Sequence, residues 1–425
     1  MTAHDATSSD RRLGDIGTRI FYVSGIIGLA SMAISLLVAM FAKDWVGFGR
    51  SYLTAFMFVL SLCLGGLFFT ALQHAVRAGW SIVLRRFAEV MASNLTWIWI
   101  LFLPVAACMW WTDLYQWRYP HDEQTAALIA GKQPFLSAGF WMMLAVAFFA
   151  VWAIFGRFYY ANSVAQDSSG DVSLTHRMQR LAPLALLLYA VTQSYAAIAW
   201  MMSLEPLWFS TMYPVYFWAA TCCGYFSLQI IVMFLVQKAG KLTKEITLEH
   251  YQDAGKMLFA FGVVFWAYIA FSQYMLIYYA NIPEETTWYL VRQMGGWGAV
   301  SLLLLVGHFV LAFLLLISKH PKRMPAVLVS IAVAMLLLHY LDLYWLVKPM
   351  VPHQAVAEAG DYSELARRAA SEPKLVGYDW TIQDLSCLAA VGGLFVAGTV
   401  RRLQKASLIP EQDPRLGESL AFENF

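Results

Sequence analysis

Long apolar runs recur along the chain and are separated by short polar connections. About 20 consecutive apolar residues suffice for a helix to cross the hydrocarbon core of a bilayer. Lipid offers no hydrogen-bond partner to free backbone groups, so each such run is expected to be helical. Ten spans are predicted, near residues 20–41, 51–73, 87–111, 136–157, 181–202, 211–236, 257–279, 296–317, 325–347 and 380–402.

Composition supports the same class of protein. Hydrophobic residues make up 60% of the 425 residues and charged residues only 13%, whereas soluble domains carry about 25% charged residues. The chain is therefore predicted to be an all-α polytopic membrane protein with about ten transmembrane helices. Its five cysteines lie in apolar runs and form no C-x-x-C pair. We therefore expect no metal site, iron–sulfur cluster or covalent haem in this chain.

Basic residues predict the orientation. Most of the 29 lysines and arginines lie on one side of the predicted spans, in segments such as 11–19, 77–86, 238–256 and 401–415. Cytoplasmic loops are enriched in lysine and arginine. Both termini are therefore predicted to be cytoplasmic.

The spans suggest a division of the chain into one membrane domain and its tails. Residues 51–202 and 211–347 are candidates for two related halves, because each opens with an outward-to-inward span followed by a basic loop. Residues 1–19 lack the apolar segment of a signal peptide, so we expect them to be retained. The predicted division is a cytoplasmic tail at 1–19, a transmembrane domain at 20–403 with a periplasmic loop at 348–379, and a cytoplasmic tail at 404–425.

Polar side chains at membrane depth need a reason, because a charge at the bilayer centre costs about 2.5–3.5 kcal/mol. On the cytoplasmic side the candidates are His74, Glu89 and Asn94. Glu89 follows Arg85 and Arg86 by four and three residues, so the three share one helix face. Two interpretations remain open: an ion pair that helps to set topology, and a carboxylate that accepts protons at an inner entrance.

On the outer side, His339 and Asp342 are three residues apart and share one helix face. A carboxylate beside an imidazole can pass a proton on, because both groups can titrate near physiological pH. A haem held by His308 and His339 is disfavoured, because no second histidine pair accompanies them. The candidates for a proton path are His74, Glu89 and Asn94 on the inner side, Gln193, Tyr195 and His308 in the middle, and Gln273, Tyr274, His339, Asp342 and Asp384 on the outer side.

Several segments resemble a known family. They are "LFAFGVVFWAYIAFSQYMLIYYANIPEETTWY" (Leu258–Tyr289), "GHFVLAFLLLISKHPKR", "LDLYWLVKP" and "SYLTAFMFVLSLCLGGLFFTALQHAVRAGW". Together they resemble the F subunit (ActF) of bacterial alternative complex III, a quinol:cytochrome c oxidoreductase. That family is similar to the NrfD/PsrC-type membrane subunits, and the likeness runs from the second predicted span to the tenth.

The resemblance implies two four-helix bundles with flanking helices, in the bacterial inner membrane. It also implies partners: a pentahaem cytochrome c, an iron–sulfur protein, a homologous quinol-binding membrane subunit, small membrane-anchored subunits and a monohaem cytochrome c, with a terminal oxidase as a further candidate. Haem c and iron–sulfur clusters would then lie in those partners. Menaquinone or ubiquinone, and lipid, are the ligands this chain itself would meet.

Three functions follow as hypotheses. The leading one is a respiratory subunit that provides proton half-channels and a surface near the quinone, with no catalytic residue of its own. Ser272, Gln273 and Tyr274 would then line a polar seam facing the bundle interior. The second is a structural, lipid-binding scaffold of the same complex. The third is a secondary transporter, which also uses repeats and polar groups at the midplane.

Overall fold

The computed structural model describes residues 11–120, 123–350, 362–378 and 380–424. These residues are largely α-helical and include no strand. Among them, nine helices are long and apolar enough to cross a membrane, or up to ten if a bent pair forms one span. The chain is thus an all-α multi-pass membrane protein.

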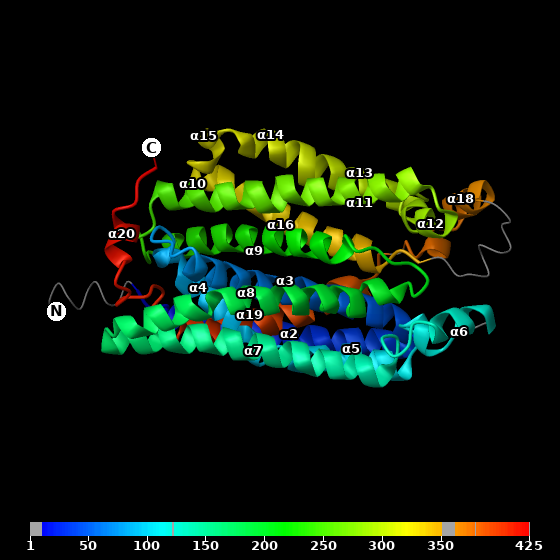
Figure 1. Ribbon diagram of the computed structural model, residues 1–425, viewed down its shortest axis with the longest axis horizontal. Coiled ribbons are helices and arrows are strands. Elements are labelled where there is room, and N and C mark those ends of the chain that lie inside the picture. Colours follow the sequence, from blue (N-terminus) through cyan, green and yellow to red (C-terminus); the bar gives the residue numbers. More distant parts are fainter. Residues whose placement is uncertain (1–10, 121–122, 351–361, 379, 425) are drawn as a thin grey trace.

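Most of the long helices lie side by side along the long axis of the molecule (Figure 1). The uninterrupted ones are α2 (Gly14–Ala42), α3 (Trp45–Ala75), α7 (Ala138–Ser169), α8 (Val172–Trp200), α9 (Tyr213–Lys238), α16 (Pro325–Val347) and α19 (Ile382–Leu403). Two more spans are built from consecutive helical segments: α10 (Leu248–Met257), η4 (Leu258–Phe265) and α11 (Trp266–Ala280), then α13 (Gly296–Leu303), η5 (Leu304–Leu311) and α14 (Ala312–Ile317).

Short helices cover the two ends of the bundle. One end carries α6 (Glu123–Ala130), α12 (Pro283–Val291) and α18 (Tyr362–Ser371), and the other carries α15 (Lys319–Lys322) and α20 (Leu416–Leu420) (Figure 1). Within the predicted loop 348–379, the structure forms the short helix α18. Residues 351–361 and 379 of that loop lie outside the described residues.

The helices form two groups, and α3 contacts helices of both. The most apolar stretch of α3 is 89% buried. One group is α3 with α4 (Ile82–Ser93), α5 (Trp99–Trp111), α7 and α8; the other is α9 with α10–α11, α13–α14 and α16. Helices α2 and α19 pair tightly and flank α3. Their approach requires glycine, since a Cβ at Gly28 would lie 2.7 Å from the backbone nitrogen of Leu394.

The third predicted span, 87–111, is not one straight helix. Helices α4 and α5 meet at an angle of 44°, through a short 3₁₀ turn at Asn94–Thr96. The Asn94 side chain donates to Thr399 Oγ1 at 2.8 Å and accepts from Trp97 Nε1 at 3.1 Å. The bend therefore begins at Asn94, ahead of Pro104, which lies inside α5.

Segments η4 and η5 are π-helical and contact each other. Single π-helical turns are rare and occur mostly at functional sites. Each segment contains a glycine, Gly262 in η4 and Gly307 in η5. A Cβ at Gly262 would lie 2.8 Å from the Cα of Cys223, so this glycine lets η4 lie against α9.

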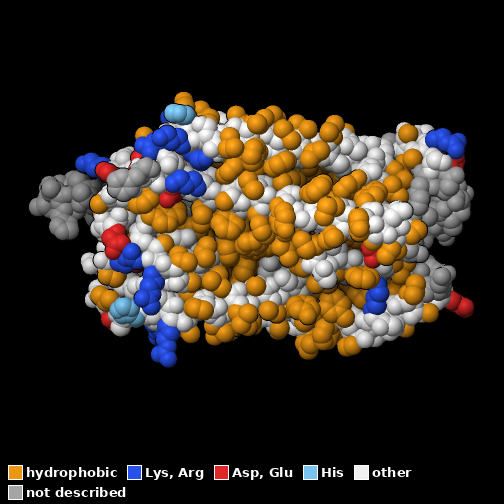
Figure 2. Space-filling model, turned by 45° about the horizontal axis from the view of Figure 1, so that its top comes forward, with side chains coloured by type: hydrophobic (Ala, Val, Ile, Leu, Met, Phe, Trp, Pro, Cys, Tyr) orange, Lys and Arg blue, Asp and Glu red, His pale blue; other side chains and the backbone are white. Residues whose placement is uncertain are grey.

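A broad apolar band covers the middle of the face drawn in Figure 2, and lysine and arginine side chains gather mainly at one end of the molecule. The first and last described segments meet at this end, where the Leu408 amide donates to the Arg11 carbonyl at 2.8 Å. Residues 404–424 fold back across the end of the bundle. The predicted cytoplasmic side is therefore one continuous end of the molecule.

Candidate functional site

Asp342 on α16 is fully buried and is held by two neutral donors. The Tyr216 hydroxyl donates to Oδ1 at 2.5 Å, and the Trp266 indole donates from Nε1 to Oδ2 at 3.1 Å. In the part of the chain that the structure describes, no lysine or arginine forms an ion pair with this carboxyl group. A buried carboxyl group without a cation is unusual, because buried charges are normally paired.

The two donors reach Asp342 from different helices. Tyr216 lies in the first turn of α9, which packs against α16. Trp266 is the first residue of α11, directly after the π-helical segment η4. Asp342 therefore sits where α9, α11 and α16 converge.

His308, which the sequence predicts to lie in the middle of the membrane, stacks on Trp266. Its ring lies parallel to the Trp266 indole, with centroids 3.8 Å apart and an angle of 6°. His308 Nε2 lies 3.1 Å from the Gly262 carbonyl oxygen. A carbonyl only accepts, so Nε2 is the protonated nitrogen, and Nδ1 has no partner among the described residues.

His339 shares a helix face with Asp342, yet the structure joins them by no hydrogen bond in the described chain. His339 Nε2 lies 2.8 Å from Ser61 Oγ, and that hydroxyl donates to the Phe58 carbonyl at 2.6 Å. The one hydroxyl hydrogen is thus used, so His339 Nε2 is the donor. A Cβ at Gly224 would lie 2.4 Å from His339 Cδ2, so glycine makes room for the ring.

A cavity of about 810 Å³ lies beside this site. Tyr216 and Trp266 form part of its wall, so Asp342 is one side chain away from it. The lining is mostly apolar and aromatic, as in sites for small lipophilic molecules. Its wall residues are Tyr216, Val264, Trp266, Ala267, Tyr268, Ala270, Phe271, Tyr274, Tyr289, Arg292, Gln293, Ser301, Leu304, Leu305, Phe309, Phe313 and Trp345.

Two buried arginines satisfy the free carbonyls at the C-terminal end of α16. Arg292 donates to the carbonyls of Trp345 at 3.1 Å and Leu346 at 3.0 Å. Arg50 donates to the carbonyls of Val347 and Lys348, both at 3.3 Å. Burial lowers the pKa of Arg292, which lies between α12 and α13 outside the spanning helices. Cations at a helix C-terminus also interact favourably with the helix dipole.

Asp384, the third outer candidate, is a paired carboxylate. It forms an ion pair with Lys348 at 2.5 Å and accepts from Ser51 Oγ at 2.7 Å. It also accepts from the Thr381 amide at 3.1 Å, which completes a capping box at the start of α19. These contacts assign Asp384 to holding α19 against α3 and α16.

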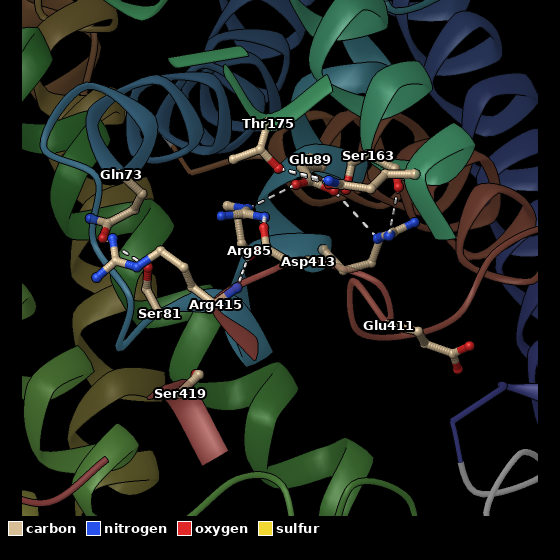
Figure 3. A network of polar contacts seen from close by, with 12 residues as sticks. Gln73, Ser81, Arg85, Glu89, Ser163, Thr175, Glu411, Asp413, Arg415 and Ser419 are labelled. Carbon is tan, nitrogen blue, oxygen red and sulfur yellow. Dashed lines mark hydrogen bonds and ion pairs between the residues drawn. The ribbon is translucent and has the colours of Figure 1, made fainter. Parts of the chain in front are cut away.

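On the inner side, Glu89 lies between two arginines, as Figure 3 shows in part. Its oxygens are 3.1 Å from Arg85 Nε and 3.3 Å from Arg86 Nε. The ion pairs expected from sequence are therefore present. His74 is not part of them: it stacks on Tyr159 with ring centroids 5.3 Å apart.

The remaining candidates are scattered. Gln193 is buried and donates to the Pro214 carbonyl at 3.2 Å, and Gln273 is buried with Nε2 unpartnered among the described residues. Tyr195 and Tyr274 are 48% and 39% exposed. The expectation that Tyr274 faces the bundle interior is therefore wrong, because the interior face of α11 is taken by Gln273 and Tyr274 lies on the cavity wall instead.

The structure adds Ser61, Tyr216 and Trp266, which sequence patterns did not single out. Tyrosine and tryptophan are frequent in this chain, so their side chains carried no distinguishing signal. The useful signal would have been an aromatic hydrogen-bond donor at the depth of Asp342 on a neighbouring span. Among the described residues, no group of three or more His, Cys, Asp or Glu side chains could hold a metal ion.

Comparison with models of protein families found no match, and no curated protein matches the chain. The function is therefore proposed from the geometry and from the segments that resemble a known family.

Proposed function

We propose that this chain is an integral membrane subunit of a bacterial respiratory quinol:cytochrome c oxidoreductase of the alternative complex III type, and that it conducts protons part of the way across the membrane. The resemblance of segments such as Leu258–Tyr289 supports the assignment to this complex. The partners would be the haem and iron–sulfur subunits and the quinol-binding membrane subunit that the resemblance implies. Electron transfer would then occur in those partners.

The observation that carries the proton-conducting role is the environment of Asp342. Its carboxyl group contacts a hydroxyl and an indole and pairs with no cation among the described residues. Such a group can gain or lose a proton without breaking an ion pair. Glu89 and Asp384 differ from Asp342, because each contacts a basic side chain.

The cavity beside Tyr216 and Trp266 supports a place for a lipophilic molecule within one side chain of Asp342. Tyr216 has a hydroxyl that bonds Asp342 and a ring on the cavity wall. A proton exchanged by Asp342 could therefore reach or leave the cavity through this hydroxyl. A quinone or a lipid chain would fit its mostly apolar walls.

A route from the inner side to Asp342 would need water between the two ends. Buried polar atoms without a protein partner are the positions where ordered water is expected. Such atoms occur on α3, α7, α8 and α9: Thr70 Oγ1, His74 Nε2, Tyr159 OH, Tyr189 OH, Thr221 Oγ1 and Ser227 Oγ.

The second candidate function is a scaffold that holds the membrane platform together. The paired carboxylate Asp384 favours it, because it joins the start of α19 to Lys348 at the end of α16 and to Ser51 on α3. A secondary transporter is the more distant alternative.

Two experiments test these proposals. Purification through an affinity tag on this chain should bring haem-stained partners and quinol:cytochrome c activity with it, whereas a transporter would come out alone. In that complex, a combined Glu89→Gln and Asp342→Asn variant should lose proton release. If the assembled variant keeps wild-type turnover and proton release, the scaffold function is correct and the proton path is wrong.

A further inference from the structure

The C-terminal segment contributes a carboxylate to the inner arginines. Asp413 lies in the C-terminal segment after α19, is 5% exposed and forms an ion pair with Arg85. Asp167 at the end of α7 forms a second ion pair, with Arg86 at 2.7 Å. Glu89 lies between these two arginines. The five residues form one cluster, called the inner cluster below.

The inner cluster is unbalanced in charge. Three carboxylates, from Glu89, Asp167 and Asp413, face only two guanidinium groups. Placing a net charge in a buried site is costly unless it is paired. One bound proton would remove the imbalance, because carboxylates that share a buried site favour the protonated form of one of them.

The groups around the cluster do not supply the missing positive charge. They are His74 from α3, Tyr160 from α7, Tyr225 from α9, Arg402 at the end of α19 and Glu411 from the C-terminal segment. Arg402 and Glu411 carry opposite charges and leave the imbalance unchanged. No hydrogen bond joins His74 to a carboxylate in the described chain. Arg415 is engaged with Glu418 at 2.5 Å.

The cluster also has unused polar atoms in its interior. Arg86 is fully buried, and its Nη1 has no hydrogen-bond partner among the described residues. Ser163 Oγ likewise has none there, whereas Arg86 Nε and Glu89 Oε2 face each other as an ion pair at 3.3 Å. Arg86 Nη1 and Ser163 Oγ can hold water that moves a proton between the carboxylates.

Only one carboxylate of the cluster reaches the surface to any extent. The Asp167 side chain is 15% exposed, whereas those of Glu89 and Asp413 are 0% and 1% exposed. Asp167 also accepts from the Glu411 amide at 2.9 Å, so the C-terminal segment lies directly beside it. Figure 3 shows Asp413 next to Arg85 and Glu411 on the same segment.

We propose that the inner cluster binds one exchangeable proton, shared between Glu89 and Asp167, which both contact Arg86, with Asp167 as the group that exchanges it with water. The C-terminal segment then contributes the Asp413 carboxylate to this site. The inference rests on the proposed function only in that the site would load the inner end of the proton path; the bound proton itself follows from the charges and contacts of the cluster.

Infrared spectroscopy of the purified complex tests it, because a protonated carboxyl group absorbs separately from carboxylate and shifts in heavy water. At neutral pH the wild type should show a protonated carboxyl contribution that disappears in Asp413→Asn, where two carboxylates face two guanidinium groups. Asp167→Asn should remove the same contribution and serves as the second variant if Asp413→Asn does not assemble. Glu418→Gln on the same segment, whose exposed carboxylate lies outside the cluster, should leave it unchanged.

Retention of the full protonated carboxyl contribution in Asp167→Asn or Asp413→Asn overturns the proposal, as does its absence from the wild type. Asp342→Asn separates this result from the proposed function. If Asp342→Asn leaves turnover and proton release intact while the Asp413-dependent contribution remains, the outer path is wrong and the inner proton site stands.

Discussion

Asp342, Asp384 and Glu89 are all fully buried, but their neighbours differ. Asp384 contacts Lys348, and Glu89 contacts two arginines. Among the described residues, Asp342 forms hydrogen bonds only with a hydroxyl and an indole. Removing one partner from a buried polar group leaves the other unsatisfied, and that cost exceeds the net value of the bond.

Tyr216→Phe removes the donor to Asp342 Oδ1. We expect it to destabilise the folded protein by about 1–3 kcal/mol, the cost of an unsatisfied buried acceptor. Tyr213→Phe is the matched control, since Tyr213 lies on the same helix with its hydroxyl unpartnered among the described residues. Thermal unfolding in detergent measures both. Equal melting temperatures for the two variants would contradict the role assigned to Tyr216.

Gly224→Ala places a methyl group against His339, where a Cβ would lie 2.4 Å from Cδ2. Overpacking of this kind costs about 1–3 kcal/mol, and it should displace His339 from Ser61. Gly392→Ala on α19 is the control, because a Cβ there meets no atom within 4 Å. The melting temperatures of the two variants test this prediction. If Gly224→Ala is as stable as Gly392→Ala, the His339 ring is not confined by Gly224.

For single residues, the sequence identifies which polar side chains lie in the spans but not which side chains they contact. Asp342 and His339 stand out because a carboxylate and an imidazole are rare in an apolar run. Their side chains nevertheless turn to different helices, towards Tyr216 and Ser61. Helical spacing places two residues on one face and says nothing about which neighbouring helix each contacts.

Among the elements, α16 shows how a membrane helix ends. The last four carbonyls of a helix have no partner within it. Here the carbonyls of Trp345, Leu346 and Val347 accept from Arg292 and Arg50, and that of Tyr344 accepts from the Lys348 amide. Arginine suits this role because its planar group presents several donors at once. The same end of α16 holds Asp342, so the arginines also help to fix its position.

Arg292→Lys keeps the charge and loses the fork of donors. Arg292 makes hydrogen bonds to three carbonyls and lies 3.4 Å over the Trp288 ring. Each hydrogen bond from a charged group contributes about 1.5–3 kcal/mol, so we expect faster amide hydrogen exchange in the last turn of α16. Arg367→Lys, at a side chain that is 74% exposed, should leave exchange unchanged. Wild-type exchange in Arg292→Lys would rule out the capping role.

The apolar runs predict where the helices lie, but not their irregularities. Each predicted span has a helix or bent helix pair in the structure, because hydropathy measures the need to cross lipid. The bend at Asn94 depends on Thr399, which is remote in sequence. The π-helical segments η4 and η5 likewise depend on tertiary packing, as the close contact of Gly262 with Cys223 indicates.

For the whole molecule, the C-terminal segment was predicted only as a cytoplasmic tail. The structure shows that it also contacts several parts of the inner end. Ser419 donates to the Trp80 carbonyl at 2.6 Å, and Asn424 Oδ1 accepts from Lys256 at 2.7 Å. Polar tail residues give no hydropathy signal, so their contacts could not be read from the sequence.

Truncation after Ile409 removes Asp413 and leaves Arg85 with Glu89 alone. Breaking a buried ion pair by deleting one partner costs about 3–5 kcal/mol, so the truncated chain should melt at a clearly lower temperature and assemble poorly. Gly417→Ala in the same segment is the control, because an added Cβ meets nothing within 4 Å there. A truncated chain that melts like the control would show that the segment is dispensable.

The central claim is that Asp342 exchanges protons during turnover. Infrared difference spectra of the purified complex, recorded before and after addition of quinol in light and heavy water, test it most directly. We predict a carboxyl band that shifts in heavy water, is present in the wild type and in Asp253→Asn, and is absent from Asp342→Asn. An identical band in Asp342→Asn, or no carboxyl band in the wild type, would contradict the account.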